Sequence, residues 1–106
     1  MAKPKILDRR VFYAGALLFR EGELGSHAYL IESGRVEVFV GRNEAETVLA
    51  DLGPGEIIGE MALIAKGPRQ ASVRALELTV CSTINEQVMD RLLESCEPGV
   101  KALLKV

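Results

Sequence analysis

The chain has no tryptophan, a single histidine and two cysteines among its 106 residues, and only 5% of them are aromatic. One histidine, His27, cannot supply the several imidazole ligands of a metal-dependent enzyme, and no Cys/His cluster replaces them. Ser26 beside His27 is not a catalytic set, because adjacency in sequence does not imply side-chain geometry. We therefore expect no enzyme activity, no catalytic residue, no metal and no cofactor.

The two cysteines, Cys81 and Cys96, have neither the spacing of a metal site nor the number needed for a disulfide framework. The simplest interpretation is that both are small, buried or half-buried thiols in a reducing compartment.

Strong charge of one sign and long hydrophobic runs are also absent. The formal net charge is −2, whereas domains that bind nucleic acid are typically basic. No apolar run approaches the ~18 residues of a membrane-spanning helix, and the N-terminal Met-Ala-Lys-Pro-Lys has no apolar segment behind it that would make a signal peptide. We expect one cytoplasmic domain with neither a nucleic-acid nor a membrane partner.

What the sequence does contain is a series of short segments divided by glycine and turn residues. Val36 and Val38 alternate with Arg35 and Glu37, which is the two-residue period of a half-buried strand. Many short strands at such spacing indicate a sandwich or barrel. Strands are predicted at residues 10–13, 16–20, 27–31, 35–40, 47–52, 70–75 and 78–84, with a sharp turn at Gly53-Pro54-Gly55.

From Asn85 the pattern becomes helical. Asn85 suits an N-cap, and Glu86 in the first turn faces the positive end of the helix dipole. One apolar face is formed by Val88, Met89, Leu92 and Leu93. Pro98 ends this helix or opens a second one, whose Leu103 and Leu104 would dock on the domain, on a second subunit or on a continuation of the chain. The expected organisation is a tail at 1–9 and a domain at 10–106, with a β-roll about 10–84 and helices about 86–106.

Two short elements between the predicted strands carry the chemistry. Residues 57–64, Ile-Ile-Gly-Glu-Met-Ala-Leu-Ile, place a glycine and a carboxylate before an apolar helical turn. Residues 67–73, Gly-Pro-Arg-Gln-Ala-Ser-Val, surround one arginine with proline and small residues. A loop arginine is usually a solvated surface charge. These neighbours instead favour a cleft-facing guanidinium that meets an anion with two oxygens, and backbone N–H groups complete a phosphate site.

These elements resemble the phosphate-binding cassette of cyclic nucleotide-binding domains: Gly-Glu-(Leu/Met)-Ala-Leu, a spacer, then Pro-Arg-(Ala/Thr/Ser)-Ala-(Thr/Ser)-Val. Gly34, Val36 and Val38 match the family's Gly-X-Val-X-Val element, and the resemblance covers roughly residues 10 to 104. It implies a mainly β fold, a jelly-roll-like β-roll (double-stranded β-helix) with a short cassette helix and C-terminal helices. It also implies a regulatory sensor that binds cAMP, or less favourably cGMP, and transmits occupancy through those helices.

The resemblance also implies which residues contact the ligand. Glu60 would accept a hydrogen bond from the ribose 2′-hydroxyl, and Arg69 would hold the cyclic phosphate. The alternative for Glu60 is a carboxylate that only suits the helix dipole, or one that forms a salt bridge to Arg69. The full predicted set is Ile58, Gly59, Glu60, Met61, Ala62, Arg69, Gln70 and Ala71.

Gln70 departs from the family pattern, which has Ala, Thr or Ser at this place. Thr or Ser there favours cGMP through the guanine amino group, and Ala leans to cAMP. A glutamine both donates and accepts hydrogen bonds, so it could contact the purine or the phosphate, crowd the pocket or point outward. A homodimer or an output domain outside this chain stays open. So does the alternative of a non-binding β-roll that serves as an interaction or dimerisation module with a degenerate cassette.

Overall fold

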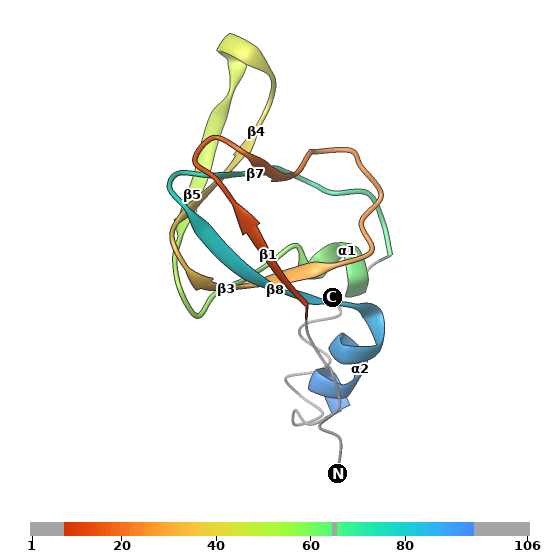
Figure 1. Cartoon of the computed structure of the whole chain (residues 1–106). Helices are drawn as coiled ribbons and strands as arrows, with labels where there is room; N and C mark the ends of the chain where they lie inside the picture. The colour runs from red at the N-terminus through yellow and green to blue at the C-terminus, as the bar shows by residue number, and fades with distance from the viewer. Residues whose placement is uncertain (1–7, 65, 95–106) are drawn as a thin grey trace.

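A computed structural model describes residues 8–64 and 66–94. Its strands form two four-stranded antiparallel sheets, in the orders β1-β8-β3-β6 and β2-β7-β4-β5 (Figure 1). The strands are β1 (Arg9–Phe12), β2 (Leu17–Phe19), β3 (Ala28–Ser33), β4 (Val36–Val40), β5 (Thr47–Leu52), β6 (Ile57–Ile58), β7 (Ser72–Ala75) and β8 (Thr79–Ile84). The helices are the 3₁₀ turn η1 (Asn43–Ala45), α1 (Glu60–Ile64) and α2 (Glu86–Glu94).

The predicted mainly β fold, with a short cassette helix followed by a helix after the last strand, is confirmed. Each strand predicted within the described residues is present, with ends that differ by up to two residues. Residues 70 and 71 bend ahead of β7, so that strand begins at Ser72 instead of 70. The sequence prediction missed β6, which has only two residues and pairs with Tyr29 and Leu30 of β3.

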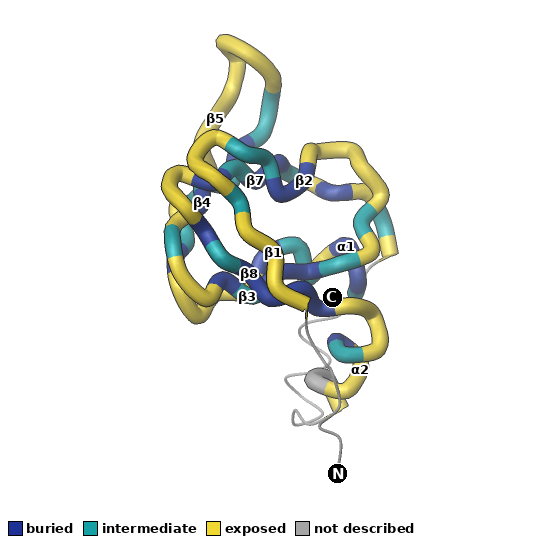
Figure 2. The backbone as a smooth tube through the Cα atoms, viewed as in Figure 1, coloured by how far each residue is buried: buried dark blue, intermediate teal, exposed yellow. Residues whose placement is uncertain are grey.

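The core lies between the two sheets, where Figure 2 shows buried segments from both. Along β4, Val36 is fully buried and Val38 partly buried against the core, whereas Glu37 points to the other face of its sheet and contacts Arg74. This is the alternation predicted from the sequence. The buried core residues are Leu18, Phe19, Tyr29, Ile31, Val36, Ile58, Val73, Ala75 and Cys81.

Gly34 makes the tight turn between β3 and β4 possible. Its φ is +94°, a region that side-chain-bearing residues rarely adopt. A Cβ at this position would also lie 2.6 Å from the Cα of Thr79. Both facts explain why glycine precedes the Val-X-Val segment.

Helix α2 continues from β8 with the cap that the sequence predicts. The Oδ1 atom of Asn85 accepts a hydrogen bond of 2.8 Å from the backbone N–H of Val88. Met89 is buried in a second apolar cluster with Ala28, Leu63 and Ile84. This cluster joins α2 to the cassette helix α1 and to the ends of β3 and β8. The predicted contacts of Leu92 and Leu93, and the second helix from Pro98, lie outside the described side chains and residues.

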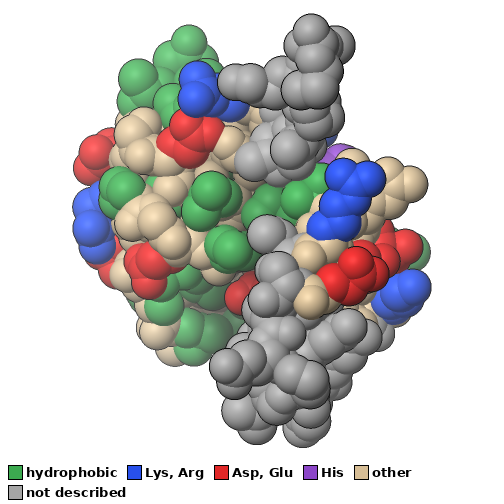
Figure 3. Space-filling view, turned by 90° about the horizontal axis from the view of Figure 1, so that it is seen from below, with side chains coloured by type: hydrophobic (Ala, Val, Ile, Leu, Met, Phe, Trp, Pro, Cys, Tyr) green, Lys and Arg blue, Asp and Glu red, His purple; other side chains and the backbone are tan. Residues whose placement is uncertain are grey.

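The described surface is mixed in character. Figure 3 shows acidic and basic side chains interspersed with hydrophobic ones on the face seen from below. Of the helices that the structure describes, none has the length and apolar composition needed to cross a membrane.

Candidate functional site

A pocket of about 430 Å³ opens beside α1. Its lining comes from both sheets and from the two predicted elements, and it includes all eight residues of the predicted set. The lining residues are Phe19, Val38, Leu52, Ile57, Ile58, Gly59, Glu60, Met61, Ala62, Gly67, Pro68, Arg69, Gln70, Ala71 and Val73. The structure therefore brings the predicted residues together around one cavity.

Arg69 is buried, with only 6% of its surface exposed. Its Nη1 donates a hydrogen bond of 2.9 Å to the carbonyl of Gly59, and its Nη2 donates one of 2.5 Å to the carbonyl of His27. Its backbone N–H donates to the carbonyl of Glu23, and its own carbonyl accepts from the N–H of Gly22. Main chain and side chain together hold this arginine in one place, so it is not a solvated surface charge.

The guanidinium of Arg69 is not in direct contact with a carboxylate in the described part of the chain, although the charge of Glu23 acts on it through space. No described carboxylate forms an ion pair with it, and its buried Nε makes no hydrogen bond. Burial lowers the pKa of its guanidinium, because desolvation disfavours the charged form. A buried cation whose side-chain hydrogen bonds go only to carbonyl oxygens, and whose Nε–H is unbonded, is a suitable receptor for an anion.

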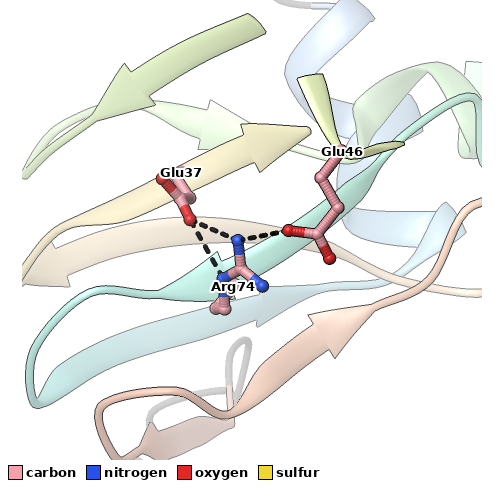
Figure 4. Close-up of polar contacts among 3 residues, drawn as sticks. All are labelled: Glu37, Glu46 and Arg74. Carbon is pink, nitrogen blue, oxygen red and sulfur yellow. Dashed lines mark hydrogen bonds and ion pairs between the residues drawn. The ribbon is translucent and has the colours of Figure 1, made fainter. Parts of the chain in front are cut away.

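Arg74 shows what a structural arginine looks like in the same fold. It lies on the opposite face of the β7–β4 sheet and contacts Glu37 and Glu46 at 2.5 and 3.1 Å (Figure 4). The hydrogen bonds that Arg74 donates to these two carboxylates raise the pKa of its guanidinium. Arg74 therefore forms ion pairs with two carboxylates, whereas no carboxylate of the described residues forms one with Arg69.

Gly59 allows the close approach of Arg69 to the cassette backbone. Its φ is +79°. A Cβ there would lie 2.5 Å from Nη1 of Arg69 and 3.0 Å from a ring carbon of Phe19. Any side chain at this position would therefore displace the guanidinium or the ring.

Glu60 is the first residue of α1, is half-buried and borders the pocket. Its carboxylate makes no hydrogen bond or ion pair with any described residue. The alternative salt bridge to Arg69 is thus not formed here. Both its suitability for the helix dipole and its proposed contact with a ribose stay predictions.

The remaining predicted residues differ in exposure. Ile58 and Ala62 are buried, Ala71 is half-buried, and Met61 and Gln70 are exposed at the rim of the pocket. Whether the Gln70 side chain contacts a ligand stays a prediction.

Sequence reasoning missed several residues of this site. Phe19 lies under Arg69, with 4.0 Å between the guanidinium carbon and the ring centroid. His27 accepts a hydrogen bond from Arg69 with its backbone carbonyl, and its ring takes no part in that bond. Val38 and Leu52 form part of the apolar wall of the pocket. The alternation in β4 already indicated that Val38 faces inward. No local pattern distinguished Phe19 from an ordinary core residue.

Comparison with known proteins gives matches over nearly the whole chain. The model of the family described as "Cyclic nucleotide-binding domain" matches residues 9–96. The Cyclic AMP receptor protein of Thermus thermophilus is 44% identical over 73 residues, which are 68% of this chain and 34% of that protein. The cAMP-dependent protein kinase regulatory subunit of Debaryomyces hansenii is 36% identical over 87 residues, 82% of this chain and 19% of that protein.

Solved structures agree with these matches. The cGMP-bound form of an EAL enzyme superposes with a TM-score of 0.84 at 36% identity, covering 92% of this chain and 26% of that one. Its cAMP-bound form gives a TM-score of 0.82 at the same identity and coverage of this chain, and covers 27% of that one. The chain spans about a third or less of the curated relatives named above. Because the family model covers most of the chain and the fold and cassette agree with it, this chain belongs to the cyclic nucleotide-binding domain family.

Proposed function

We propose that this chain is a regulatory domain that binds a 3′,5′-cyclic nucleotide reversibly and does not transform it. The observation that carries the proposal is Arg69: a buried guanidinium beside a pocket, without a carboxylate partner among the described residues. A cyclic phosphate would place a negative charge in direct contact with this guanidinium. Its two exocyclic oxygens suit the fork of a guanidinium.

We assign roles to the other predicted residues as part of this proposal, using their positions around the pocket. Gly59, Met61 and Ala62 surround the start of α1, where first-turn N–H groups lack intrahelical acceptors and can donate to phosphate oxygens. Glu60, whose carboxylate has no described partner, would accept from the ribose 2′-hydroxyl. Val38 and Leu52 would give the sugar and purine an apolar wall.

We propose cAMP as the preferred ligand and cGMP as the weaker one. Relatives named for each nucleotide occur, since a cAMP-dependent regulatory subunit and a cGMP-dependent protein kinase of Toxoplasma gondii match this chain at 36% and 37% identity. Gln70 has neither the hydroxyl group that favours cGMP nor the small side chain that favours cAMP at this position. The preference therefore depends on the direction of its amide.

Occupancy of the pocket would be transmitted through α2. Leu63 of the cassette helix and Met89 of α2 belong to one buried cluster. A nucleotide that binds better to one position of α1 than to another would shift the equilibrium of the attached helix. The element that receives this change would be a second copy of the chain or another domain.

Thermal denaturation with and without nucleotide tests the proposal. At a ligand concentration of ~100 times the dissociation constant, the stabilisation is expected to be roughly 2.7 kcal/mol. Arg69→Lys should remove most of the shift, because an ammonium cannot make the paired contact. Arg74→Lys is the matched control, since Arg74 lies on the other face of the sheet, and it should keep the shift. The absence of any shift with millimolar cAMP or cGMP would refute the proposal.

A further inference from the structure

The guanidinium of Arg69 rests on a column of aromatic rings. Its central carbon lies 4.0 Å from the centroid of the Phe19 ring. Phe19 is stacked on Tyr29, with centroids 6.3 Å apart and ring planes 17° from parallel. Tyr29 in turn meets the edge of Phe12 at 5.8 Å. Phe19 and Tyr29 are buried, so the surface under Arg69 consists of packed core rings.

Gly25 limits the position of the same guanidinium. A Cβ at Gly25 would lie 2.3 Å from the central carbon of the guanidinium and 2.3 Å from its Nε. The φ of Gly25 is not in the left-handed region, so its conformation does not require glycine. What requires glycine here is space for the arginine.

We propose that Phe19 and Gly25 are positioning residues of the nucleotide site, which hold the guanidinium of Arg69 in the orientation that receives the phosphate. The proposal rests on the proposed function, in which Arg69 is the phosphate ligand. A long arginine side chain loses conformational freedom when it binds an anion, and a site that already holds it loses less. The ring face attracts the cation without using any of its N–H donors, which leaves for an anion the N–H groups that are not bonded to the carbonyls of Gly59 and His27.

The simpler role for Phe19 is that of a core residue alone, since it belongs to the main apolar cluster. The chain contains a matched control for this role. Phe39 is also buried and lies under Arg74, with 4.3 Å between the guanidinium carbon and the ring centroid. Phe39 does not line the nucleotide pocket. Replacing either phenylalanine removes a buried ring from under an arginine, but only Phe19 concerns the proposed phosphate ligand.

The test combines a spectroscopic readout on the unliganded chain with an affinity. The Nε–H proton resonance of Arg69 is assigned by its disappearance in Arg69→Lys, and it should carry a ring-current shift from Phe19. Phe19→Leu should remove that shift and weaken binding of cAMP about tenfold. Phe39→Leu should move the Arg74 resonance instead and leave the affinity within about twofold of the wild type.

Gly25→Ala supplies a second route in case Phe19→Leu does not fold. It should displace the Arg69 resonance and weaken binding without removing a core ring. In the Arg69→Lys background, Phe19→Leu and Gly25→Ala should cost little further affinity, because the group that they position is gone.

The outcomes separate the two proposals. An unchanged Arg69 resonance in both variants, or a loss of affinity no larger than that of Phe39→Leu, would overturn the positioning role. Equal losses with and without Arg69 would do the same, since they would mean that Phe19 acts through the fold or on the nucleotide directly. If the wild type binds no cyclic nucleotide while the resonance behaves as expected, the proposed function fails and the positioning of Arg69 as a phosphate receptor fails with it. The contact between Phe19 and the guanidinium would still stand.

Discussion

The backbone carbonyl of Gly59 accepts a hydrogen bond of 2.9 Å from Nη1 of Arg69. This bond joins the glycine before α1 to the arginine before β7, so the two elements of the cassette are held against each other. The second donor, Nη2, donates to the carbonyl of His27, the residue before β3. One side chain thus links three segments around the pocket. A substitution in any of these segments should therefore alter the position of the other two.

Gly59→Ala should destabilise the chain and abolish nucleotide binding. The substitution strains a residue at positive φ, which costs about 1–3 kcal/mol, and its Cβ would clash with Arg69 and Phe19. Gly55→Ala is the control, because Gly55 has a φ of +91° but no atom within 4 Å of the added Cβ. Urea denaturation should show the larger loss for Gly59→Ala. Equal losses would mean that backbone strain alone is responsible and that the contact with Arg69 is unimportant.

Glu60→Gln should weaken binding of cAMP by about tenfold, since hydrogen bonds to charged groups contribute roughly 1.5–3 kcal/mol. The same substitution should hardly change the affinity for 2′-deoxy-cAMP, which lacks the hydroxyl. Titrations of both ligands against wild type and variant give the comparison. If the two ligands lose the same free energy, Glu60 does not hold the ribose.

Gln70 is expected to influence the choice of purine. Gln70→Thr should raise the affinity for cGMP relative to cAMP, because a hydroxyl can accept from the guanine amino group, and Gln70→Ala should change the ratio in the opposite direction. Competition binding with a fluorescent cyclic nucleotide measures the ratio for each variant. Identical ratios in all three proteins would show that this side chain points away from the base.

Met89 is expected to connect the pocket to α2. Met89→Ala removes a buried side chain from the cluster with Leu63 and Ile84 and should lower the free energy of unfolding by about 2–5 kcal/mol. In the wild type, nucleotide should slow amide exchange in α2, and Met89→Ala should reduce this protection more than the exposed Gln87→Ala does. Protection that is the same in both variants would argue against transmission through the cluster.

Cys81 should be unreactive in the folded chain. It is completely buried, and desolvation raises the pKa of its thiol from 9.0 to about 11. This thiol loses its proton at a lower pH in the unfolded chain than in the folded chain. Below the ordinary pKa the buried thiol therefore contributes fully to the free energy of unfolding, and this contribution decreases as pH rises toward about 11. Mass spectrometry after alkylation at pH 8 should find Cys81 modified only when the chain is unfolded. Modification at equal rates in both states would contradict its burial.

Much of the fold follows from local patterns. The alternation of Val36 and Val38 gave the inward face of β4, and Asn85 gave the start of α2, because each signal needs only neighbouring residues. β6 was missed, since two residues are too few to show a period and the strand exists only by pairing with β3. Local chemistry defines local elements, whereas pairing between distant strands has to be observed.

The residues of the site also differ in whether the sequence alone could reveal them. The motif around Glu60 and Arg69 was visible because both elements are continuous in sequence. The two residues that lie against the Arg69 guanidinium, Phe19 and Gly25, were not visible, because both are far from Arg69 along the chain. In the sequence Phe19 resembles an ordinary core residue, and Gly25 resembles an ordinary loop glycine. The absence of a described carboxylate partner for Arg69 is likewise a property of the folded chain, which no spacing reveals.

The most direct test of the central claim is a calorimetric titration of the chain with 3′,5′-cAMP, compared with 5′-AMP and with the Arg69→Lys variant. The claim predicts saturable binding of one cyclic nucleotide per chain, weaker binding of the acyclic nucleotide and a loss of at least about tenfold in the variant, equivalent to ~1.4 kcal/mol. Absence of heat and of saturation with both cAMP and cGMP, or binding that Arg69→Lys leaves unchanged, would contradict it.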